Sequence, residues 1–264
     1  MNITIRFAPH PKRLLSIVFQ AFVILIILLP CIIFPMALQA QKNTNENKAY
    51  VVLLHGLGRT HRTMWFLEHN LKKHGYEVIN QSYPSTKYAI DDLAKEIGTA
   101  VEQRCTDPQR PVHFVTHSLG GIVLRHYLAG HPSINLGRVV MLSPPNQGSE
   151  LANIFQENSL ITFFGGPVIK QLGTCPTSIP NQLGPVYGEV GVITGDKSLN
   201  PLFSYLIPGK DDGTVSVEST KVEGMRDFLV VHRSHTFIMN STEVISQVLN
   251  FLQQGKFIHN QISG

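Results

Sequence analysis

The sequence lacks the residue patterns that mark most metal and nucleic-acid sites. It contains three cysteines, no C-x-x-C pair and no H-E-x-x-H motif, so it predicts neither a bound metal ion nor a cofactor. Charged residues make up only 15% of the chain, and the net charge of +4 comes from scattered lysines and arginines. Because no basic run is interleaved with aromatic residues, the sequence does not predict binding to nucleic acid.

What the sequence does contain is enough apolar material for one domain, preceded by a distinct N-terminal segment. The chain has 264 residues, 43% of them hydrophobic, which suffices for a single core. Residues 1–41 differ from the rest, because Arg6, Lys12 and Arg13 precede an uncharged stretch at residues 14–34. This stretch is close to the ~20 residues that cross a bilayer and longer than the ~7–15 of a signal-peptide core. We therefore expect residues 14–34 to enter the membrane as an uncleaved signal anchor.

A cleaved signal peptide remains an alternative, because Ala37–Ala40 offers a small residue before a cut. In either case the basic flank stays in the cytoplasm and the remainder is exported, either membrane-anchored or secreted and periplasmic. Residues 42–48 are polar and rich in Asn, which predicts a linker before a domain at residues 49–264. Export would place Cys105 and Cys175 where a disulfide can form, although two unpaired thiols are an equal alternative.

Short apolar runs alternate with helical patterns along the domain. Strands are predicted at Tyr50–Leu54, Tyr76–Asn80, Val112–Thr116, Arg138–Leu142, Glu189–Thr194 and Asp227–Val231. Helices are predicted at Thr63–Lys73, Ile90–Arg104, Gly120–Leu128 and Glu243–Phe251. Such alternation is typical of an α/β fold with a mainly parallel central sheet and helices on both faces.

One segment, residues 159–188, breaks this alternation. It is rich in Gly and Pro and carries apolar residues that we expect to be exposed, namely Phe163, Phe164, Val168, Ile169 and Leu172. Long irregular insertions in compact domains are usually functional loops. We interpret this segment as a cap over a binding site, with a variable surface loop as the alternative.

The clearest chemical signal is a serine placed between a strand and a helix. The run Val112–Thr116 is followed by His117 and Ser118, and then by Gly120 and Gly121 at the start of a helix. This is the context of the nucleophile elbow of α/β hydrolases, G-x-S-x-G, in which a sharp turn exposes the serine hydroxyl above the sheet. Thr116 stands where the pattern has its first glycine, and the context on both sides is intact. Ser118 is the candidate nucleophile.

Backbone donors for an oxyanion are predicted from two places. The strand Tyr50–Leu54 ends in His55-Gly56-Leu57-Gly58, where this fold forms half of its oxyanion hole. The N–H groups of Leu57 and Leu119 would then converge on the tetrahedral intermediate. The alternative is a glycine turn that merely ends the strand.

A serine nucleophile needs a base and an acid that orients the base, in the order Ser, Asp or Glu, His. His235 follows the strand Asp227–Val231 and is the candidate base, while His232 is its competitor. His126 and His131 precede the acid and are predicted to be solvated histidines. For the acid, the sequence offers Asp196, directly after a strand, and Asp212, in the turn Asp211-Asp212-Gly213; spacing alone does not separate them.

At these residues the chain resembles bacterial triacylglycerol lipase-like α/β hydrolases, including the group related to GPI-inositol deacylases. The matching stretches are His55-Gly56-Leu57-Gly58, Thr116-His117-Ser118-Leu119-Gly120-Gly121, Pro144-Pro145-Asn146-Gln147-Gly148-Ser149, Asp211-Asp212-Gly213-Thr214-Val215 and Ser234-His235. The resemblance implies Asp212 as the acid, because such lipases carry it in an Asp-Gly turn a little over twenty residues before the base. It also implies that calcium is not expected, because Phe237 stands where related secreted lipases have a calcium ligand. The Pro144–Ser149 stretch is expected to shape the pocket wall.

The sequence therefore predicts a serine hydrolase acting on lipid or small-molecule esters through Ser118, Asp212, His235 and an acyl-enzyme. An acyltransferase with the same residues is the first alternative, because only the acceptor of the acyl group differs. The second is a membrane-tethered binding module that keeps the fold without catalysis.

Overall fold

The computed structural model describes residues 49–131 and 134–259, so the predicted signal anchor and linker within residues 1–48 lie outside the described residues. Six strands form one sheet: β1 (Tyr50–Leu54), β2 (Glu77–Gln81), β3 (Val112–His117), β4 (Leu136–Leu142), β5 (Val190–Gly195) and β6 (Asp227–Val231). Their order is β2-β1-β3-β4-β5-β6, and every neighbouring pair is parallel. The parallel-sheet prediction is thus confirmed.

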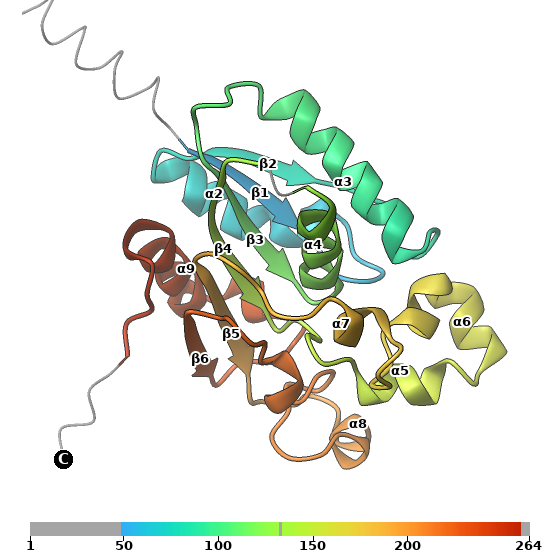
Figure 1. The fold of residues 1–264 in the computed structure, drawn as a ribbon. Coiled ribbons are helices and arrows are strands. Elements are labelled where there is room, and N and C mark those ends of the chain that lie inside the picture. The colour runs from blue at the N-terminus through green and yellow to red at the C-terminus, as the bar shows by residue number, and fades with distance from the viewer. Residues whose placement is uncertain (1–48, 132–133, 260–264) are drawn as a thin grey trace, which may run out of the picture. The chain divides into compact units, whose positions relative to one another are not determined.

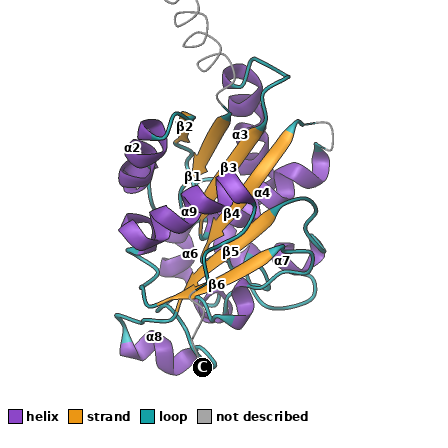
Figure 2. Cartoon of the chain, turned by 90° about the vertical axis from the view of Figure 1, so that its left-hand side faces the viewer, coloured by secondary structure: helices purple, strands orange, loops and turns teal. Residues whose placement is uncertain are grey.

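Four longer helices cover the two faces of the sheet (Figure 1). They are α2 (Trp65–Lys73), α3 (Ile90–Arg104), α4 (Leu119–Gly130) and α9 (Thr242–Gln254). Apolar side chains of α3 and α4 pack with one face of β1, β3 and β4, and those of α2 and α9 pack with the other. In Figure 2, α9 crosses in front of the twisted strands. Burial on both faces explains why the central strand β1 is continuously apolar and does not alternate.

The parallel arrangement brings the carboxyl ends of all six strands to one edge. β1 ends before His55, β3 ends directly before Ser118, and β6 ends shortly before His235. Ligands of open α/β sheets bind at this edge. Residues that are far apart in the sequence therefore meet at a position that the sheet fixes.

Four short helices gather at this edge (Figure 1). They are α5 (Glu150–Phe155), α6 (Ser159–Gly165), α7 (Ile179–Gln182) and α8 (Pro201–Leu206), with the 3-10 helix η2 (Pro167–Gln171) between α6 and α7. Further 3-10 helices are η1 (His61–Met64), η3 (Glu218–Thr220) and η4 (Ile238–Asn240). Within residues 49–131 and 134–259, none of the helices has the length and apolar character needed to cross a membrane.

Candidate active site

Ser118 lies at the sharp turn between β3 and α4. Its backbone has φ 52° and ψ −123°, an unusual conformation for a residue with a side chain. The turn needs Gly120, because a Cβ there would lie 2.6 Å from the carbonyl oxygen of Leu54. The substituted position Thr116 is accommodated in the core, where its hydroxyl lies 3.3 Å from the place a Cβ of Gly121 would occupy. The elbow therefore forms despite the missing first glycine, because Gly121 leaves room for Thr116.

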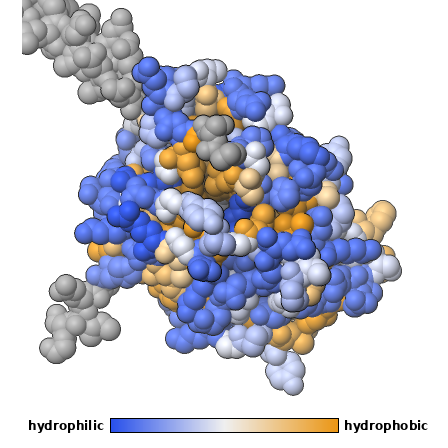
Figure 3. Space-filling view, in the orientation of Figure 1, coloured by the Kyte–Doolittle hydropathy of each residue, from blue (hydrophilic) through white to orange (hydrophobic). Residues whose placement is uncertain are grey.

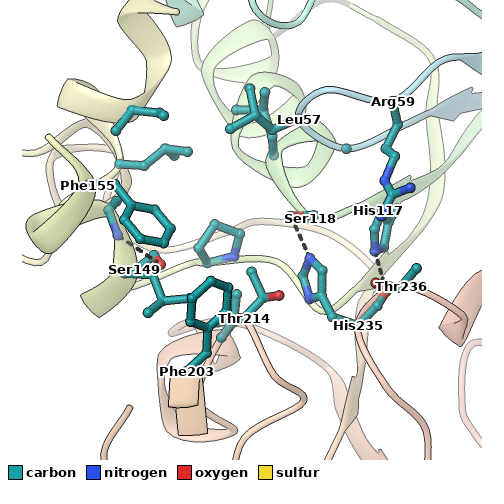
Figure 4. Close-up of a pocket in the computed structure, with 18 residues that line it drawn as sticks. Leu57, Arg59, His117, Ser118, Ser149, Phe155, Phe203, Thr214, His235 and Thr236 are labelled. Carbon is teal, nitrogen blue, oxygen red and sulfur yellow. Dashed lines mark hydrogen bonds between the residues drawn. The ribbon is translucent and has the colours of Figure 1, made fainter. Parts of the chain in front are cut away.

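Three predicted residues form one chain of hydrogen bonds, and Figure 4 shows the part of it between Ser118 and His235. Nε2 of His235 lies 3.0 Å from Oγ of Ser118, and Nδ1 of His235 lies 2.7 Å from Oδ2 of Asp212. A carboxylate only accepts, so Nδ1 carries the proton of the neutral imidazole and Nε2 is left to accept from the serine hydroxyl. This tautomer suits removal of a proton from Ser118.

Asp212 is held by its own turn. Its Oδ1 accepts hydrogen bonds from the backbone N–H groups of Thr214 and Val215 at 3.0 and 2.9 Å, and its carbonyl accepts from His235 N–H at 2.9 Å. Burial acts to raise the pKa of this carboxyl, but the nearby His235 and the hydrogen bonds from His235 and Val215 outweigh it, so the pKa lies below its ordinary value. Asp212 is therefore ionised at neutral pH and can orient and stabilise a charged imidazolium.

Both predicted oxyanion donors border the same cavity as Ser118. Leu57 follows β1 and Leu119 is the first residue of α4, whose N–H has no acceptor inside the helix. The Leu57 loop is tied down by two contacts: Gly58 N–H donates to Oγ of Ser85 at 3.0 Å, and the Tyr83 hydroxyl donates to the carbonyl of His55. The Tyr83 and His55 rings also stack at 4.2 Å. These contacts fix where the Leu57 N–H lies relative to Ser118.

The cavity beside Ser118 has a volume of about 250 Å³ and a mainly apolar wall. Side chains from the loop after β4, from α5, from η2 and from α8 supply this wall: Pro145, Leu151, Ala152, Phe155, Ile169, Leu172 and Phe203. The rings of Phe155 and Phe203 meet edge to face at 5.6 Å between α5 and α8. Pro145 and Ser149 come from the Pro144–Ser149 stretch that was expected to shape the pocket wall. The cavity can accept an apolar group next to the serine hydroxyl.

A model of the alpha/beta hydrolase family matches residues 51–209, which is more than half of the chain. The chain belongs to the alpha/beta hydrolase family. No curated protein matches its sequence. The family and the fold expected from the elbow are thus confirmed.

Solved structures similar to this hydrolase include enzymes from three organisms. Phospholipase PlaB from Legionella pneumophila gives a TM-score of 0.65 at 20% identity, and the match covers 79% of this chain and 61% of the phospholipase. Mature lipase BlEst2 from Bacillus licheniformis gives 0.63 at 18% identity, covering 78% of this chain and 92% of the lipase. Aspergillus fumigatus lipase B gives 0.60 at 15% identity, covering 78% and 53%. The likeness shows the fold, and this hydrolase spans only 61% of the length of the Legionella phospholipase.

The competing candidates lie elsewhere in the hydrolase. Asp196 and His232 contact each other, with Oδ1 and Nδ1 3.0 Å apart, and the His232 side chain is 73% exposed. His126 pairs with Asp91 on the surface, and Nδ1 of His131 contacts the carbonyl of Tyr127. None of these residues is among those lining the cavity beside Ser118.

The segment at residues 159–188 is less irregular and less exposed than predicted. Phe163 and Phe164 on α6 are exposed, but Val168, Ile169 and Leu172 are buried, so the prediction that all five are exposed is wrong. Val168 on the 3-10 helix η2 and Leu172 directly after it pack with core residues of α3 and α4. Ile169 and Leu172 line the cavity, whereas most of its wall comes from outside this segment. A capping role for the segment remains a prediction.

Two further predictions concern the cysteines and metal binding. Cys105 and Cys175 are both free thiols in the structure, and Cys175 is exposed. In the part of the chain that the structure describes, no three His, Cys, Asp or Glu side chains group closely enough to hold a metal ion.

His117 is a site residue that the sequence analysis did not identify. Its Nε2 lies 3.0 Å from the carbonyl oxygen of His235, and the two rings are 4.8 Å apart. A carbonyl only accepts, so Nε2 of His117 is the donor. Burial holds the pKa of His117 well below its ordinary value of 6.5, so the ring stays neutral. Only its position next to Ser118 could have indicated this role, because the elbow motif does not require a histidine there.

Proposed function

We propose that this hydrolase cleaves carboxylic esters through Ser118, His235 and Asp212. The observation that carries the proposal is the unbroken hydrogen-bond chain from Oγ of Ser118 through His235 to Asp212, at the wall of an apolar cavity. The similar structures carry the names of a phospholipase and two lipases, which supports an ester substrate. No cofactor takes part in the proposed reaction.

In the proposed mechanism His235 removes the proton from Ser118 as its Oγ attacks the ester carbonyl carbon. The N–H groups of Leu57 and Leu119 stabilise the oxyanion that forms, and the loss of one such donor costs about 3–4 kcal/mol in other hydrolases. His235 then protonates the departing alcohol, leaving the acyl group on Ser118. Water, activated by His235, releases the acid and restores the serine.

An apolar acyl chain is the substrate feature that the surroundings favour. The cavity wall is mainly apolar, and exposed apolar side chains follow on the neighbouring short helices: Leu160, Phe163 and Phe164 on α6, and Leu202 and Tyr205 on α8. Monomeric proteins seldom expose such groups together unless they bind something apolar. We therefore propose that the substrates of this hydrolase are lipid-like esters and that residues 159–188 act as the cap.

The test is hydrolysis of p-nitrophenyl esters of increasing acyl length by the full chain and by Ser118→Ala. We expect the substitution to lower kcat by roughly 10⁴-fold or more and to abolish labelling by a fluorophosphonate. Added alcohols serve as competing acceptors, and acyl transfer to them at the expense of hydrolysis would assign an acyltransferase. If the folded native chain cleaved no ester and ignored the probe, a binding module would replace the enzyme as the proposed function.

We also propose that the domain acts outside the cytoplasm, tethered by residues 14–34 or released by a signal peptidase. The proposal rests on the basic flank and the uncharged stretch in the sequence. Intact-mass measurement of the mature protein, with fractionation of the cells, distinguishes the two forms. A full-length protein in the cytoplasmic fraction would contradict both.

A further inference from the structure

A second cavity lies on the face of the sheet that α4 covers. It has a volume of about 300 Å³, and none of its lining residues borders the cavity beside Ser118. Apolar side chains from the end of α4, from β4 and the residues before it, and from the chain leading into β5 form most of its wall: Leu128, Ala129, Ile134, Leu136, Val139, Met141, Leu183, Pro185, Val186, Tyr187 and Val190. Figure 3 views the molecule from this side, and apolar side chains gather near the centre of the face. We call this cavity the α4 groove.

The groove exists because the chain that precedes β5 covers the sheet incompletely. After α7, residues 183–188 cross this face without forming a helix. Val186 N–H donates to the carbonyl of Glu223 at 2.8 Å, which holds the crossing segment in place, and Tyr187 remains 80% exposed. An apolar surface is thus left open where a helix would otherwise pack.

A buried positive charge lies at the wall of the α4 groove. Arg125, on α4, is only 6% exposed and is one of the lining residues. Nη1 donates to the carbonyl and the side-chain oxygen of Asn146 at 3.0 and 3.2 Å, and Nη2 donates to the carbonyl of Gly184 at 2.6 Å. All three acceptors are neutral. Among the described residues Arg125 forms no salt bridge, and its Nε makes no hydrogen bond.

The acceptors fix the guanidinium in one orientation. The amide of Asn146 cannot flip, because its Nδ2 donates to the carbonyl of Thr220 at 2.8 Å while its oxygen accepts from Arg125. A planar guanidinium held in this way keeps its remaining donors in a set geometry. Burial lowers the pKa of Arg125 to about 10, which leaves it charged at neutral pH. Buried charges in proteins are as a rule paired, and this one lacks a counter-charge beside an open apolar cavity.

We propose that the α4 groove binds a medium-chain fatty acid, whose carboxylate pairs with Arg125 and whose hydrocarbon chain lies on the apolar wall. The two halves of the ligand match the two features of the groove. A carboxylate can accept from Nε and from the second N–H of Nη2 of Arg125, the side-on pairing that arginine favours. The volume is at the lower end of that of small-molecule sites, which suits a medium chain. The proposal does not depend on catalysis at Ser118.

The test is photolabelling of the full-length chain carrying Ser118→Ala, so that neither turnover nor an acyl-enzyme contributes. A diazirine-bearing medium-chain fatty acid is the probe, and the labelled peptides are identified by mass spectrometry. We expect labelling within residues 183–190 or at the end of α4, competed by decanoate but not by decanol. Arg125→Met should lower this labelling by about tenfold or more, because the charge-assisted hydrogen bonds are lost.

Two further variants keep the proposal open to refutation if Arg125→Met fails to fold. Ala129→Trp fills the groove from its exposed rim and leaves Arg125 in place, so it should lower labelling as strongly. Ile258→Trp is the matched control at an exposed position outside the groove, and it should leave labelling unchanged. Absent labelling of the groove or equal competition by decanol would overturn the proposal.

Discussion

Two Asp–His pairs in this hydrolase look alike in sequence and differ in structure. In the pair of Asp212 and His235 the two atoms in contact are 2.7 Å apart, with side chains 0% and 11% exposed. In the pair of Asp196 and His232 they are 3.0 Å apart, with side chains 22% and 73% exposed. Water screens the second pair, and exposed ion pairs contribute about 0–1 kcal/mol. Burial therefore separates an electrostatically strong pair from a weak one.

The more important difference is the third partner. Nε2 of His235 reaches Oγ of Ser118 at 3.0 Å, while the described residues offer no nucleophile to His232. The backbone reinforces this arrangement, because His235 N–H donates to the carbonyl of Asp212 and its own carbonyl accepts from His117. An Asp–His contact is thus chemically useful only where the fold supplies both a dry environment and a substrate-facing hydroxyl.

The largest expected effect comes from removing each histidine in turn. His235→Ala should lower kcat for a soluble ester by about 10⁴–10⁶-fold, because among the described residues no other base contacts Oγ of Ser118. His232→Ala is the matched control and should stay within about twofold of the native rate, as exposed substitutions change free energies by roughly 0.5 kcal/mol or less. Steady-state kinetics on the two variants shows which histidine is the base, and comparable losses of kcat in both would refute the assignment of His235.

The acids are tested in the same way. Asp212→Asn preserves the shape of the side chain but removes the charge that fixes the tautomer of His235, and we expect kcat to fall about 10³–10⁴-fold. Asp196→Asn should again remain within about twofold, since its partner is exposed. A stronger loss for Asp196→Asn than for Asp212→Asn would show that the wrong acid has been chosen.

The fold could be predicted from the sequence because burial of the strands and long helices leaves apolar patterns that can be recognised. β1, β6 and α3 begin and end where their patterns predicted, and the other long elements differ by one to three residues at an end. The short helices α5 to α8 were missed. Helices of four to seven residues are not stable by themselves and form only through tertiary packing, so their sequences carry no clear periodicity.

The candidate site was predictable where a residue lies next to a strand end and not where distant segments meet. Ser118 and His235 follow strands, so order along the chain sufficed. The choice of Asp212 needed the family resemblance, because nothing in the spacing shows that Asp196 turns toward His232. Phe155 and Phe203 were missed, since the contact between α5 and α8 that joins them depends on the whole arrangement at the sheet edge.

A smaller effect on kcat is expected from His117, which contacts His235 of the buried Asp–His pair and neither residue of the exposed pair. His117→Phe keeps a ring against His235 but removes the donor to its carbonyl, so we expect kcat to fall about 10–100-fold with little change in KM, as for other small displacements of a catalytic group. His113→Phe is the matched control, because His113 is also a buried histidine on β3 but accepts from Arg138 N–H. Equal kcat values for the two folded variants would leave His117 with a packing role alone.

The smallest effect concerns stability in acid. The pKa of Asp212 lies below its ordinary value of 3.8, so the unfolded chain takes up this proton at a higher pH than the folded one. The stabilisation from Asp212 is then fully present above pH ~4 and is lost as the pH falls through the lower folded pKa. Urea unfolding between pH 6 and pH 2.5 should therefore show a steeper acid loss of stability for the native chain than for Asp212→Asn, which has no such proton to bind. Parallel plots of unfolding free energy against pH for the two proteins would show that His235 does not stabilise the buried carboxylate. The Asp212–His235 pair would then differ from the exposed Asp196–His232 pair only in its contact with Ser118.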